Sequence, residues 1–551
     1  MKGRMMDFPL TLGHVLERAR SLFPRNAIAS RGPDGIVTRT TYGALHERSC
    51  RLANALVRLG VKPGDRVATL AWNQDRHLEA YLAIPAMGAV LHTLNLRLHA
   101  TDLAYIAGHA EDRVVIVDAS LLPLLRQFAR KVPSIQHVIV MPDVPWAPVS
   151  GAGTGAVGSG EKLLDYEELL AKENGTFDFP ELDENSASII CYTSGTTGNP
   201  KGVVYSHRSA VLHTLVACMA DAMGVSEDDT VLMVVPMFHA NAWGLPHICA
   251  LTGASVVLPG PKLDPESLLD LMVKEKVTIA AGVPTIWLGI LALLDANPGK
   301  WDLSGVRKTL VGGSAAPPAM IDGFKKRHGL TVTHAWGMTE TSPIGSLARV
   351  KRHLGPVDDA ASLALRSTQG YPLPFVEIRH VDDEGRVLPT DGKSMGELEV
   401  RGPWVSGSYM GDDAKDRWTN DGWFKTGDVV TLDAEGYISI TDRSKDVIKS
   451  GGEWISSVDL ENALMSHPAV LEAAVFAGKH AKWGERPIAA VALKPGQKAT
   501  EEELAQHLAP RFAKMSLPDA YVFVEQVPRT STGKFLKRKL REDYGELLLK
   551  R

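Results

Sequence analysis

The sequence predicts an α/β protein with three parts: a large N-terminal domain of layered α/β subdomains, a β-rich subdomain, and a small mobile α+β C-terminal domain. Three observations support this prediction. Short apolar segments alternate with helical segments to about residue 290, acidic turns separate short strands after Gly370, and a mixed pattern returns after Asp442. Strands that alternate with helices of about ten residues or more indicate parallel α/β layers. The length of 551 residues also implies three or four folding units, at about 150 residues per domain.

Composition and charge exclude several classes of protein. Hydrophobic residues make up 44% and charged residues 23% of the chain, which excludes a disordered, collagenous or coiled-coil protein. The net charge of −4 gives no indication of a nucleic-acid partner. We find no apolar run near the roughly 20 residues of a membrane helix and no secretory signal. The four cysteines are sparse and lie in apolar contexts, so we expect buried reduced thiols and a cytoplasmic protein.

The N-terminal part shows the alternation in detail. An amphipathic helix is expected at Leu12–Leu22, a second one begins at Thr41 and ends at Gly60, and a third runs from Leu78 into Pro85. Strands are expected from Ala89 and at 67–70, 113–118, 138–141, 188–192, 231–235, 255–258, 278–281 and 309–311. The glycine-rich segment 145–160 has no apolar period and is expected to be a flexible loop.

The C-terminal third divides into two patterns. Short strands at 376–381, 397–401, 429–433 and 437–441, with acidic hairpin turns at 382–385 and 433–436, predict the β-rich subdomain at about 370–442. Beyond it we expect helices at 458–465 and 501–514 and strands at 470–476 and 488–493. The charged segment 442–446 is the predicted boundary, which gives an N-terminal domain at 1–442 and a C-terminal domain at 443–551.

The strongest local signal is a glycine- and hydroxyl-rich loop at 192–202 that directly follows the strand ending at Cys191. Glycines allow close backbone approach, hydroxyls add donors and a lysine adds a mobile cation, so the loop suits a polyphosphate. It is not GxxxxGK[ST], which argues against a GTPase or kinase, and no GxGxxG is present. The residues expected to hold phosphate are Thr193, Ser194, Gly195, Thr196, Thr197, Gly198 and Lys201.

This loop resembles the signature of the adenylate-forming superfamily, which contains acyl-CoA synthetases, peptide-synthetase adenylation domains and luciferases. The resemblance extends over nearly the whole chain, and further motifs follow in the family's order: PMFHANAW at 236–243, GGSAAP at 312–317, HAWGMTET at 334–341, TGD at 426–428 and DRSKDVIKSGGEWI at 442–455. These strings are most similar to the fatty-acyl-CoA synthetase branch, which includes medium- and long-chain fatty acid ligases and the ligases of 3-(methylthio)propionate.

The resemblance implies an ATP site. Trp336 stands where Tyr or Phe is more usual and is expected to stack on adenine, while Asp428 accepts hydrogen bonds from the ribose hydroxyls. Glu340, helped by Thr193, is expected to hold Mg²⁺, which prefers oxygen ligands. The other nucleotide residues implied are Gly313, Ser314, His334, Ala335, Gly337 and Thr339.

The resemblance also implies an acyl pocket. His239 would lie near the substrate carboxylate and Trp243 would form a wall, although a histidine beside a phenylalanine is by itself more often a packing residue. The full set expected to bind the acid is His239, Ala240, Trp243, Gly312, Gly313, Trp336 and Pro343. The indole of Trp336 leaves less room for a long tail, whereas the small residues Ala240, Ala242 and Gly244 could open space.

The C-terminal motifs imply a moving domain. Arg443 is expected near phosphates and ribose, and Lys445 at the hinge. The loop with Lys449, Gly451, Gly452, Glu453 and Trp454 would enter the site for the second half-reaction and border the thiol tunnel, with Glu485 contributing to that conformation. Lys534, after a tight polar turn, would orient the carboxylate and the α-phosphate during the first half-reaction. A charged linker alone is the alternative for 442–455, but it does not explain Gly-Gly-Glu-Trp.

The resemblance therefore implies an AMP-forming acid–thiol ligase that uses ATP, Mg²⁺ and coenzyme A. We expect a short- to medium-chain fatty acid or 3-(methylthio)propionate as the acid. Because no carrier-protein domain follows Lys534, free coenzyme A is the expected thiol, and homodimers among relatives suggest a homodimer. The alternatives are a long-chain ligase, a carrier-loading or luciferase-like enzyme, and a non-catalytic acyl-adenylate binding protein.

Overall fold

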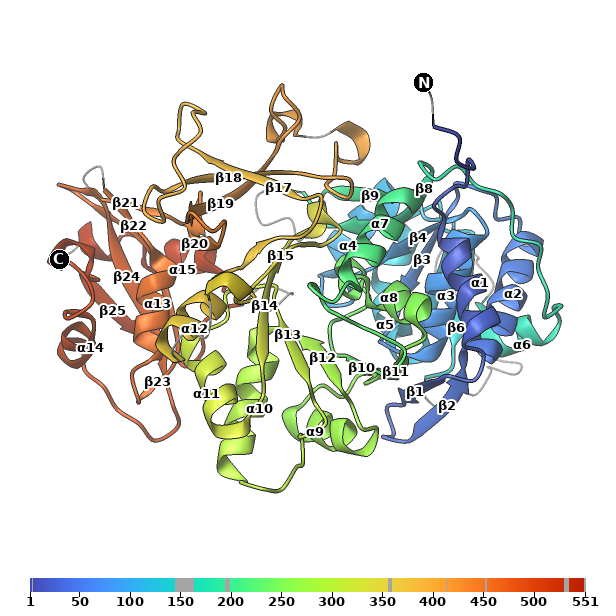
Figure 1. Cartoon of the computed structure of the whole chain (residues 1–551), viewed down its shortest axis with the longest axis horizontal. Helices are drawn as coiled ribbons and strands as arrows, with labels where there is room; N and C mark the ends of the chain where they lie inside the picture. The colour runs from blue at the N-terminus through green and yellow to red at the C-terminus, as the bar shows by residue number, and fades with distance from the viewer. Residues whose placement is uncertain are drawn as a thin grey trace.

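The computed structural model describes residues 1, 3–143, 163–193, 199–354, 359–412, 414–450, 453–529 and 535–549. The loop predicted at 145–160 lies outside these residues. Within them the strands form four sheets (Figure 1). Among the same residues, no helix combines the length and the apolar character needed to cross a bilayer.

A seven-stranded sheet lies in the N-terminal third, in the order β7-β6-β5-β3-β4-β8-β9. All its pairs are parallel except β8 with β9. Its strands are β3 (Arg66–Leu70), β4 (Val90–Thr93), β5 (Val114–Asp118), β6 (His137–Met141), β7 (Leu163–Asp165), β8 (Ala187–Tyr192) and β9 (Gly202–Ser206).

A nine-stranded sheet follows, in the order β16-β15-β14-β13-β12-β10-β11-β1-β2. Its central strands are parallel, and β2, β15 and β16 pair antiparallel with their neighbours. Its strands are β1 (Ala27–Arg31), β2 (Val37–Thr41), β10 (Thr230–Met233), β11 (Ser255–Leu258), β12 (Ile279–Gly282), β13 (Lys308–Val311), β14 (Val332–Gly337), β15 (Ile344–Leu347) and β16 (Tyr371–Pro372).

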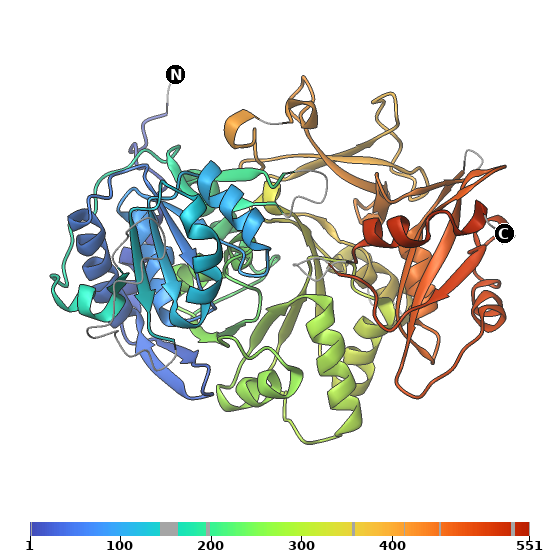
Figure 2. The ribbon, with the colours of Figure 1, turned by 180° about the vertical axis from the view of Figure 1, so that it is seen from behind.

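Helices cover both faces of both sheets, because alternate strand residues point to opposite faces. Val115 and Val117 face α4 (Ala100–His109) and α5 (Leu122–Phe128), which Figure 2 shows on the near side. A central layer lies between the sheets: α1 (Leu12–Leu22), α2 (Tyr42–Arg58), α3 (Asp75–Ala86), α7 (His207–Ala217) and α8 (Leu245–Thr252), with α6 (Tyr166–Ala171) beside α2. The far face of the nine-stranded sheet packs on α9 (Pro265–Lys274), α10 (Pro284–Ala296) and α11 (Pro318–His328), with α12 (Asp359–Ser367) beside α11.

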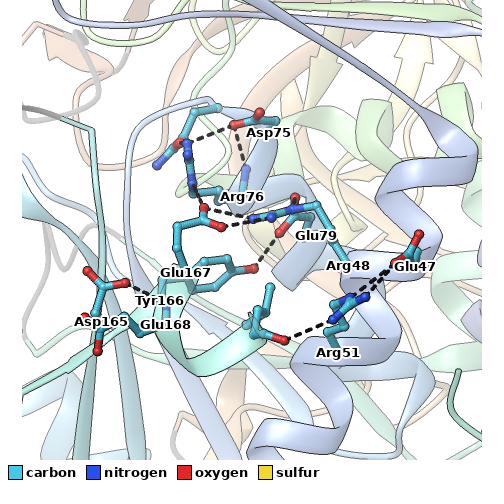
Figure 3. Close-up of polar contacts among 12 residues, drawn as sticks. Glu47, Arg48, Arg51, Asp75, Arg76, Glu79, Asp165, Tyr166, Glu167 and Glu168 are labelled. Carbon is cyan, nitrogen blue, oxygen red and sulfur yellow. Dashed lines mark hydrogen bonds and ion pairs between the residues drawn. The ribbon is translucent and has the colours of Figure 1, made fainter. Parts of the chain in front are cut away.

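A polar network joins three helices of this N-terminal region (Figure 3). The guanidinium of Arg48 on α2 contacts Glu79 on α3 at 2.6 Å and Glu167 on α6 at 2.9 Å. Arg76 contacts the same Glu167 at 2.6 Å, and the Tyr166 hydroxyl donates to Glu79 at 2.7 Å. Each charged group therefore has a partner of opposite charge, as a buried network requires.

The β-rich subdomain is a four-stranded antiparallel sheet in the order β17-β18-β19-β20, at the top of Figure 1. Its strands are β17 (Glu377–Val381), β18 (Gly396–Arg401), β19 (Phe424–Leu432) and β20 (Ile438–Arg443). The turn at 433–436 joins β19 to β20, as the sequence predicts, since the Asp433 side chain accepts N–H groups from Glu435 and Tyr437.

The C-terminal part is α+β, as expected. Its five-stranded sheet follows the order β22-β21-β24-β23, with β25 beside β24. The strands are β21 (Ile448–Ser450), β22 (Glu453–Ile455), β23 (Val470–His480), β24 (Gly484–Leu493) and β25 (Ala520–Phe523). One face packs on α13 (Ser457–Met465) and α14 (Glu501–Leu508), and the other on α15 (Lys537–Tyr544).

Several expectations need correction. Strand β9 lies where the sequence suggests only the end of a loop, because its pairing with β8 is not visible locally. The helix predicted at 501–514 ends at Leu508, and β19 begins at Phe424, five positions before the predicted start. The sheets are mixed, not purely parallel. Cys50, Cys191 and Cys249 are buried as expected, but Cys218 is only partly buried.

Candidate active site

A cavity of about 540 Å³ lies where the nine-stranded sheet, the four-stranded sheet and the C-terminal domain meet. Its lining includes residues that directly follow β12, β13 and β14. The carboxyl ends of parallel strands are the usual place for ligands in open α/β sheets, because the loops there are free to carry polar groups.

Most of the residues selected from the sequence line this one cavity. They are Thr193, Lys201, His239, Ala240, Trp243, Gly312, Gly313, Ser314, His334, Ala335, Trp336, Gly337, Thr339, Glu340, Pro343, Asp428, Arg443 and Lys445. Another group lies outside the described residues: Ser194, Gly195, Thr196, Thr197, Gly198, Gly451, Gly452 and Lys534. Arg529 and Phe535, on either side of the undescribed segment that contains Lys534, also line the cavity.

One end of the cavity is built around the buried carboxylate of Asp428 on β19, whose side chain is 4% exposed. Arg443, its cross-strand neighbour on β20, contacts Oδ1 through Nε at 2.7 Å. The indole Nε1 of Trp336 on β14 donates to Oδ2 at 2.9 Å. Two separate sheets therefore hold the two oxygens of one carboxylate.

Trp336 fits in this position because its neighbours are small. A Cβ atom added at Gly345 would lie 2.4 Å from Cζ3 of the indole, so a side chain there would displace the ring. Strands β14 and β15 change register between Trp336 and Gly337, as at a bulge, and bulges redirect side chains near sites.

A second wall joins Lys201, Tyr409 and Glu340. The Tyr409 hydroxyl donates to Glu340 Oε1 at 2.6 Å, and the Lys201 ammonium lies 5.9 Å from the centroid of the Tyr409 ring. Burial and the adjacent carboxylate raise the pKa of Tyr409, so its hydroxyl stays protonated and able to donate. Two hydrogen bonds join Thr193 and Lys201 across the base of the glycine- and hydroxyl-rich loop. The Thr193 N–H donates to the Lys201 carbonyl at 2.9 Å, and the Thr193 hydroxyl accepts the Lys201 N–H at 3.1 Å.

The donors on this wall fit Mg²⁺ bound together with a nucleotide. Among the described residues, no group of three or more His, Cys, Asp and Glu side chains is placed to hold a metal unaided. Mg²⁺ usually takes one or two carboxylates and fills its remaining positions with water and phosphate oxygens. Glu340 and Thr193, both on the cavity lining, supply such a partial set.

His334 is a neutral acceptor on the same lining. Burial lowers the pKa of this imidazole, and its Nε2 accepts the Ala316 N–H at 3.3 Å. The contact holds the loop after β13, which carries Gly312 to Ser314, against strand β14.

Another part of the cavity wall is formed by an unusual turn. Ala240, Asn241, Ala242 and Trp243 all have left-handed φ values between 43° and 59°, each of which costs about 1–2 kcal/mol for a residue with a Cβ. Backbone strain of this kind concentrates at functional sites. The turn brings the Trp243 ring so close to Gly312 that a Cβ there would lie 3.2 Å from its Cη2 atom.

The whole-chain comparisons agree with this geometry. The family model described as "AMP-binding enzyme" matches residues 16–410, and the model of the "AMP-binding enzyme C-terminal domain" matches residues 459–534. The chain belongs to the AMP-binding enzyme family.

Similar relatives match at least 98% of the chain. It is similar to a long-chain fatty acid–CoA ligase of Thermus thermophilus (51% identical, 98% of this chain and 96% of the relative). It is 45% identical to the 3-methylmercaptopropionyl-CoA ligase of Ruegeria pomeroyi and 44% to the medium-chain fatty acid–CoA ligase of Ectopseudomonas oleovorans, over 100% of this chain and at least 99% of each relative. Among solved structures, the anthranilate–CoA ligase AuaEII with anthranoyl-AMP matches with a TM-score of 0.86, 27% identity and 99% coverage of both chains. The predicted family, fold and enzyme class, an AMP-forming acid–CoA ligase, are confirmed.

Two of the residues predicted to act in the second half-reaction, Lys449 and Glu485, are not on the cavity lining. Lys449 on β21 and Glu485 on β24 are held together, since the Lys449 N–H donates to Glu485 Oε2 at 2.9 Å, and neither residue is on the cavity lining. The Lys449 ammonium lies 3.6 Å from Asp383 at the edge of the β-rich subdomain. Glu453 and Trp454 belong to the adjoining strand β22. The structure therefore gathers most of the residues predicted to bind ATP and the acid, but not Lys449 and Glu485.

Sequence reasoning missed a polar cluster where the C-terminal domain of this AMP-binding enzyme meets strand β20. The buried ammonium of Lys537 on α15 lies 2.7 Å from Glu461 on α13 and 3.9 Å from Asp442 on β20, and it donates to the Ser457 hydroxyl. Asp442 Oδ2 also accepts the Ser457 N–H at 3.0 Å. Lys537, Glu461 and Asp442 all line the cavity.

Tyr409 was also missed by sequence reasoning. The motifs carry no signal for it or for Lys537, since a tyrosine in a loop and a lysine on a charged helix are ordinary features. A signal existed for Asp442, which opens the hinge motif, but not for its partners.

Proposed function

We propose that this AMP-binding enzyme activates a short- to medium-chain carboxylic acid, a fatty acid or 3-(methylthio)propionate, and transfers the acyl group to coenzyme A. The observation that supports this proposal best is that Asp428 and Trp243 line the same cavity. A nucleotide and an acid can therefore meet within it, the first over Trp336 and Asp428 and the second beside His239 and Trp243.

In the first half-reaction, a carboxylate oxygen of the acid attacks the α-phosphorus of ATP, and the bond to pyrophosphate breaks. Both reactants are anionic, so the main task of the site is to offset negative charge and hold the two reactants in line. Lys201 and Arg443 line the cavity and supply cations there, and we assign to Lys534 the role of orienting the carboxylate and the α-phosphate. Mg²⁺ bound at Glu340 and Thr193 would neutralise phosphate charge.

In the second half-reaction, the sulfur of coenzyme A attacks the acyl carbonyl, and AMP departs as the bond from carbonyl carbon to phosphate oxygen breaks. We propose that the domain 443–551 rotates about Lys445 relative to 1–442 between the steps. Lys534 then withdraws, and the segment from Lys449 to Trp454, with Glu485, moves to the site. The separation of Lys449 and Glu485 from the cavity lining supports an arrangement suited to the first step.

Two buried indoles support a short or medium acid. Trp243 and Trp336 are 6% exposed and both line the cavity, so rigid rings occupy space that a long tail would need. The relatives named for medium-chain and 3-methylmercaptopropionyl substrates point the same way. A long-chain acid is the second candidate, because the Thermus thermophilus relative named for long-chain substrates has the higher identity.

A coupled assay of AMP release tests the proposal, with acetate, 3-(methylthio)propionate, butyrate, octanoate and palmitate as acids. We expect release that requires free coenzyme A, with the highest kcat/KM between 3-(methylthio)propionate and octanoate. A preference for palmitate would favour the long-chain candidate. AMP release that does not require coenzyme A would contradict the acid–CoA ligase. The absence of AMP release with every acid would support a non-catalytic binding protein.

The role of Lys534 can be separated from thiolation. Lys534→Ala is expected to abolish adenylate formation and to spare the reaction of supplied acyl-adenylate with coenzyme A. Lys539→Ala is a control on helix α15, since Lys539 is an exposed lysine paired with Asp543. Equal loss of both half-reactions in Lys534→Ala would contradict the assignment.

Trp243 is assigned to acid selection. Trp243→Ala is expected to change the order of preference among the acids more than the KM for ATP, because the ring packs beside Gly312, whereas the predicted ribose ligand is Asp428. An unchanged acid preference with a raised KM for ATP would contradict this role.

We also propose that the protein is a cytoplasmic homodimer. Light scattering of the purified protein would test the dimer.

A further inference from the structure

We propose that Trp336 is a positioning residue for ribose recognition: its indole N–H fixes the orientation of the Asp428 carboxylate that receives the ribose hydroxyls. This inference rests on the proposed function and adds a role for the edge of the ring, distinct from any stacking of its face on the base.

The geometry of the carboxylate carries the argument. An ionised carboxylate has two oxygens and about four acceptor positions. Arg443 uses one position on Oδ1 and Trp336 uses one on Oδ2, at 2.7 and 2.9 Å. Both oxygens are thereby fixed while acceptor positions remain for two vicinal hydroxyls, and rotation of the carboxylate about its χ2 angle would break both contacts.

The donor has to be the edge of an indole. Phenylalanine at 336 would have no donor, and a tyrosine would carry its hydroxyl at the tip of the ring instead of on its edge. The indole can present its face to a purine while its N–H remains on Asp428, because the N–H lies in the ring plane. The absence of a Cβ at Gly345 provides the space that keeps the ring in this place.

The two sides of Asp428 differ in rigidity. The Arg443 side chain is 38% exposed, whereas Trp336 is 6% exposed and lies on a strand of the nine-stranded sheet. Arg443 also lies two positions before Lys445, about which the C-terminal domain is proposed to rotate, so its contact is the one expected to change when that domain moves. Trp336 therefore keeps Asp428 oriented in both half-reactions.

The experiment compares ATP with 2′-deoxyATP and 3′-deoxyATP in the exchange of pyrophosphate into ATP. Two variants are used. One is Trp336→Phe, and in the other 3-benzothienylalanine replaces Trp336 alone. This residue is an isostere in which sulfur replaces the indole N–H. In both we expect the KM for ATP to rise about tenfold, the effect of one lost hydrogen bond to a charged group, with kcat nearly unchanged. The penalty for removing a ribose hydroxyl should shrink by a similar factor.

Gly345→Ala tests the same role without changing either member of the pair. The added methyl group would displace the indole, so discrimination between ATP and the deoxynucleotides should again fall. Gly305→Ala is the matched control, since a Cβ at Gly305 has no atom within 4 Å, and it should behave as wild type.

Two results would overturn the proposal. One is an isostere variant with the wild-type KM and the wild-type penalty for the deoxynucleotides. The other is an equal loss for ATP and both deoxynucleotides, which would show that the ring acts by stacking or packing alone. Calorimetric binding of AMP and 2′-deoxyAMP gives the same comparison without turnover. A wild-type protein that exchanges no pyrophosphate with any acid would instead reject the proposed function.

Discussion

The molecule contains two polar networks of similar chemistry, each around a buried glutamate, in very different places. The Arg48–Glu79 network joins α2, α3 and α6 within the N-terminal region (Figure 3), and none of its members lines the cavity. The Lys537–Glu461 network joins α13 and α15 to strand β20 and is part of the cavity wall.

In both networks, burial raises the pKa of the glutamate, to about 7 for Glu79 and for Glu461, although a cation lies beside each. Burial alone would lower the pKa of Lys537, but the Glu461 and Asp442 carboxylates outweigh it and raise that pKa. A perturbed buried glutamate is therefore not by itself a sign of function. What distinguishes the second network is its position between two domains that are proposed to move.

The largest effect is expected for Lys537→Met. The variant leaves Glu461 and Asp442 buried without their cation, which should lower the free energy of unfolding by about 4 kcal/mol, as for other broken buried ion pairs. Because Lys537 also lines the cavity, pyrophosphate exchange per folded molecule should fall at least about tenfold. Urea unfolding and the exchange assay measure the two effects.

If Lys537→Met lost stability but kept full exchange activity, the two networks would be equivalent and the comparison would fail. The double variant Glu461→Leu/Lys537→Met separates the causes, since replacing both charges with apolar groups often restores stability. Stability should recover in the double variant while activity remains low.

Arg48→Met is the corresponding test of the first network. It leaves Glu79 without its closest cation and should lower the free energy of unfolding by about 3 kcal/mol, less than for Lys537 because Arg48 is 30% exposed. The kcat and KM of the folded fraction should not change. A raised KM for ATP in this variant would show that the network reaches the site.

The contrast also shows how far the sequence could predict the fold. Helix α1 and its buried face of Leu12, Val15, Leu16 and Ala19 follow directly from the periodicity. Strand β9 does not, because Gly202–Ser206 becomes a strand only by pairing with β8. Helix α14 ends at Leu508, two residues before Pro510, and this proline is a local stop signal that the predicted range 501–514 overlooked.

The same limit applies to the candidate site. The order of the motifs predicted that Trp336, Asp428 and Arg443 bind the nucleotide, and all three line one cavity. The bond between Trp336 and Asp428 joins positions 92 residues apart, and Lys537 contacts Ser457, 80 residues away, and Glu461 and Asp442 at similar separations, so no spacing rule could predict them. Lys537 looks like a solvated charge in the sequence, and only the packing of α15 on α13 and β20 buries it.

The raised pKa of the two glutamates predicts a dependence of folding stability on pH that differs from that of an ordinary surface carboxyl. The pKa of Glu79 is raised from 4.5 to about 7 on folding, so the native state binds more protons than the unfolded state in that window. Stability should therefore fall as pH rises from about 4.5 to 7, by at most about 1.4 kcal/mol per pH unit for one group. Glu79→Gln should remove its share of the slope, and unfolding in urea at several pH values measures it.

The share of the slope due to Glu461 should persist in Glu79→Gln, because the two networks are separate. A slope that steepens, or that does not change, would mean that Glu79 is not the protonated group. Below about pH 4.5 both states bind the proton, so wild type and variant should there run parallel.

The smallest effect is expected for Arg541→Ala, which tests the contact between α15 and the hinge segment. Arg541 Nη1 lies 2.6 Å from Asp446 Oδ1, with the two side chains 27% and 12% exposed. An ion pair of this exposure contributes about 0.5 kcal/mol, so its loss should shift the ratio of the two half-reaction rates by about twofold.

Both residues lie within the domain 443–551, but Asp446 directly follows Lys445, so the pair ties α15 to the proposed hinge and favours the hinge conformation seen in this structure. Adenylation should slow and thiolation of supplied acyl-adenylate should quicken, and the difference should shrink at high salt as screening weakens the pair. Arg538→Ala is the matched control, since Arg538 contacts only Glu542 on its own helix among the ion pairs seen in the described residues. Equal changes in both half-reactions, or the same shift in Arg538→Ala, would assign the contact to stability alone and would leave Lys537 as the link between the domains.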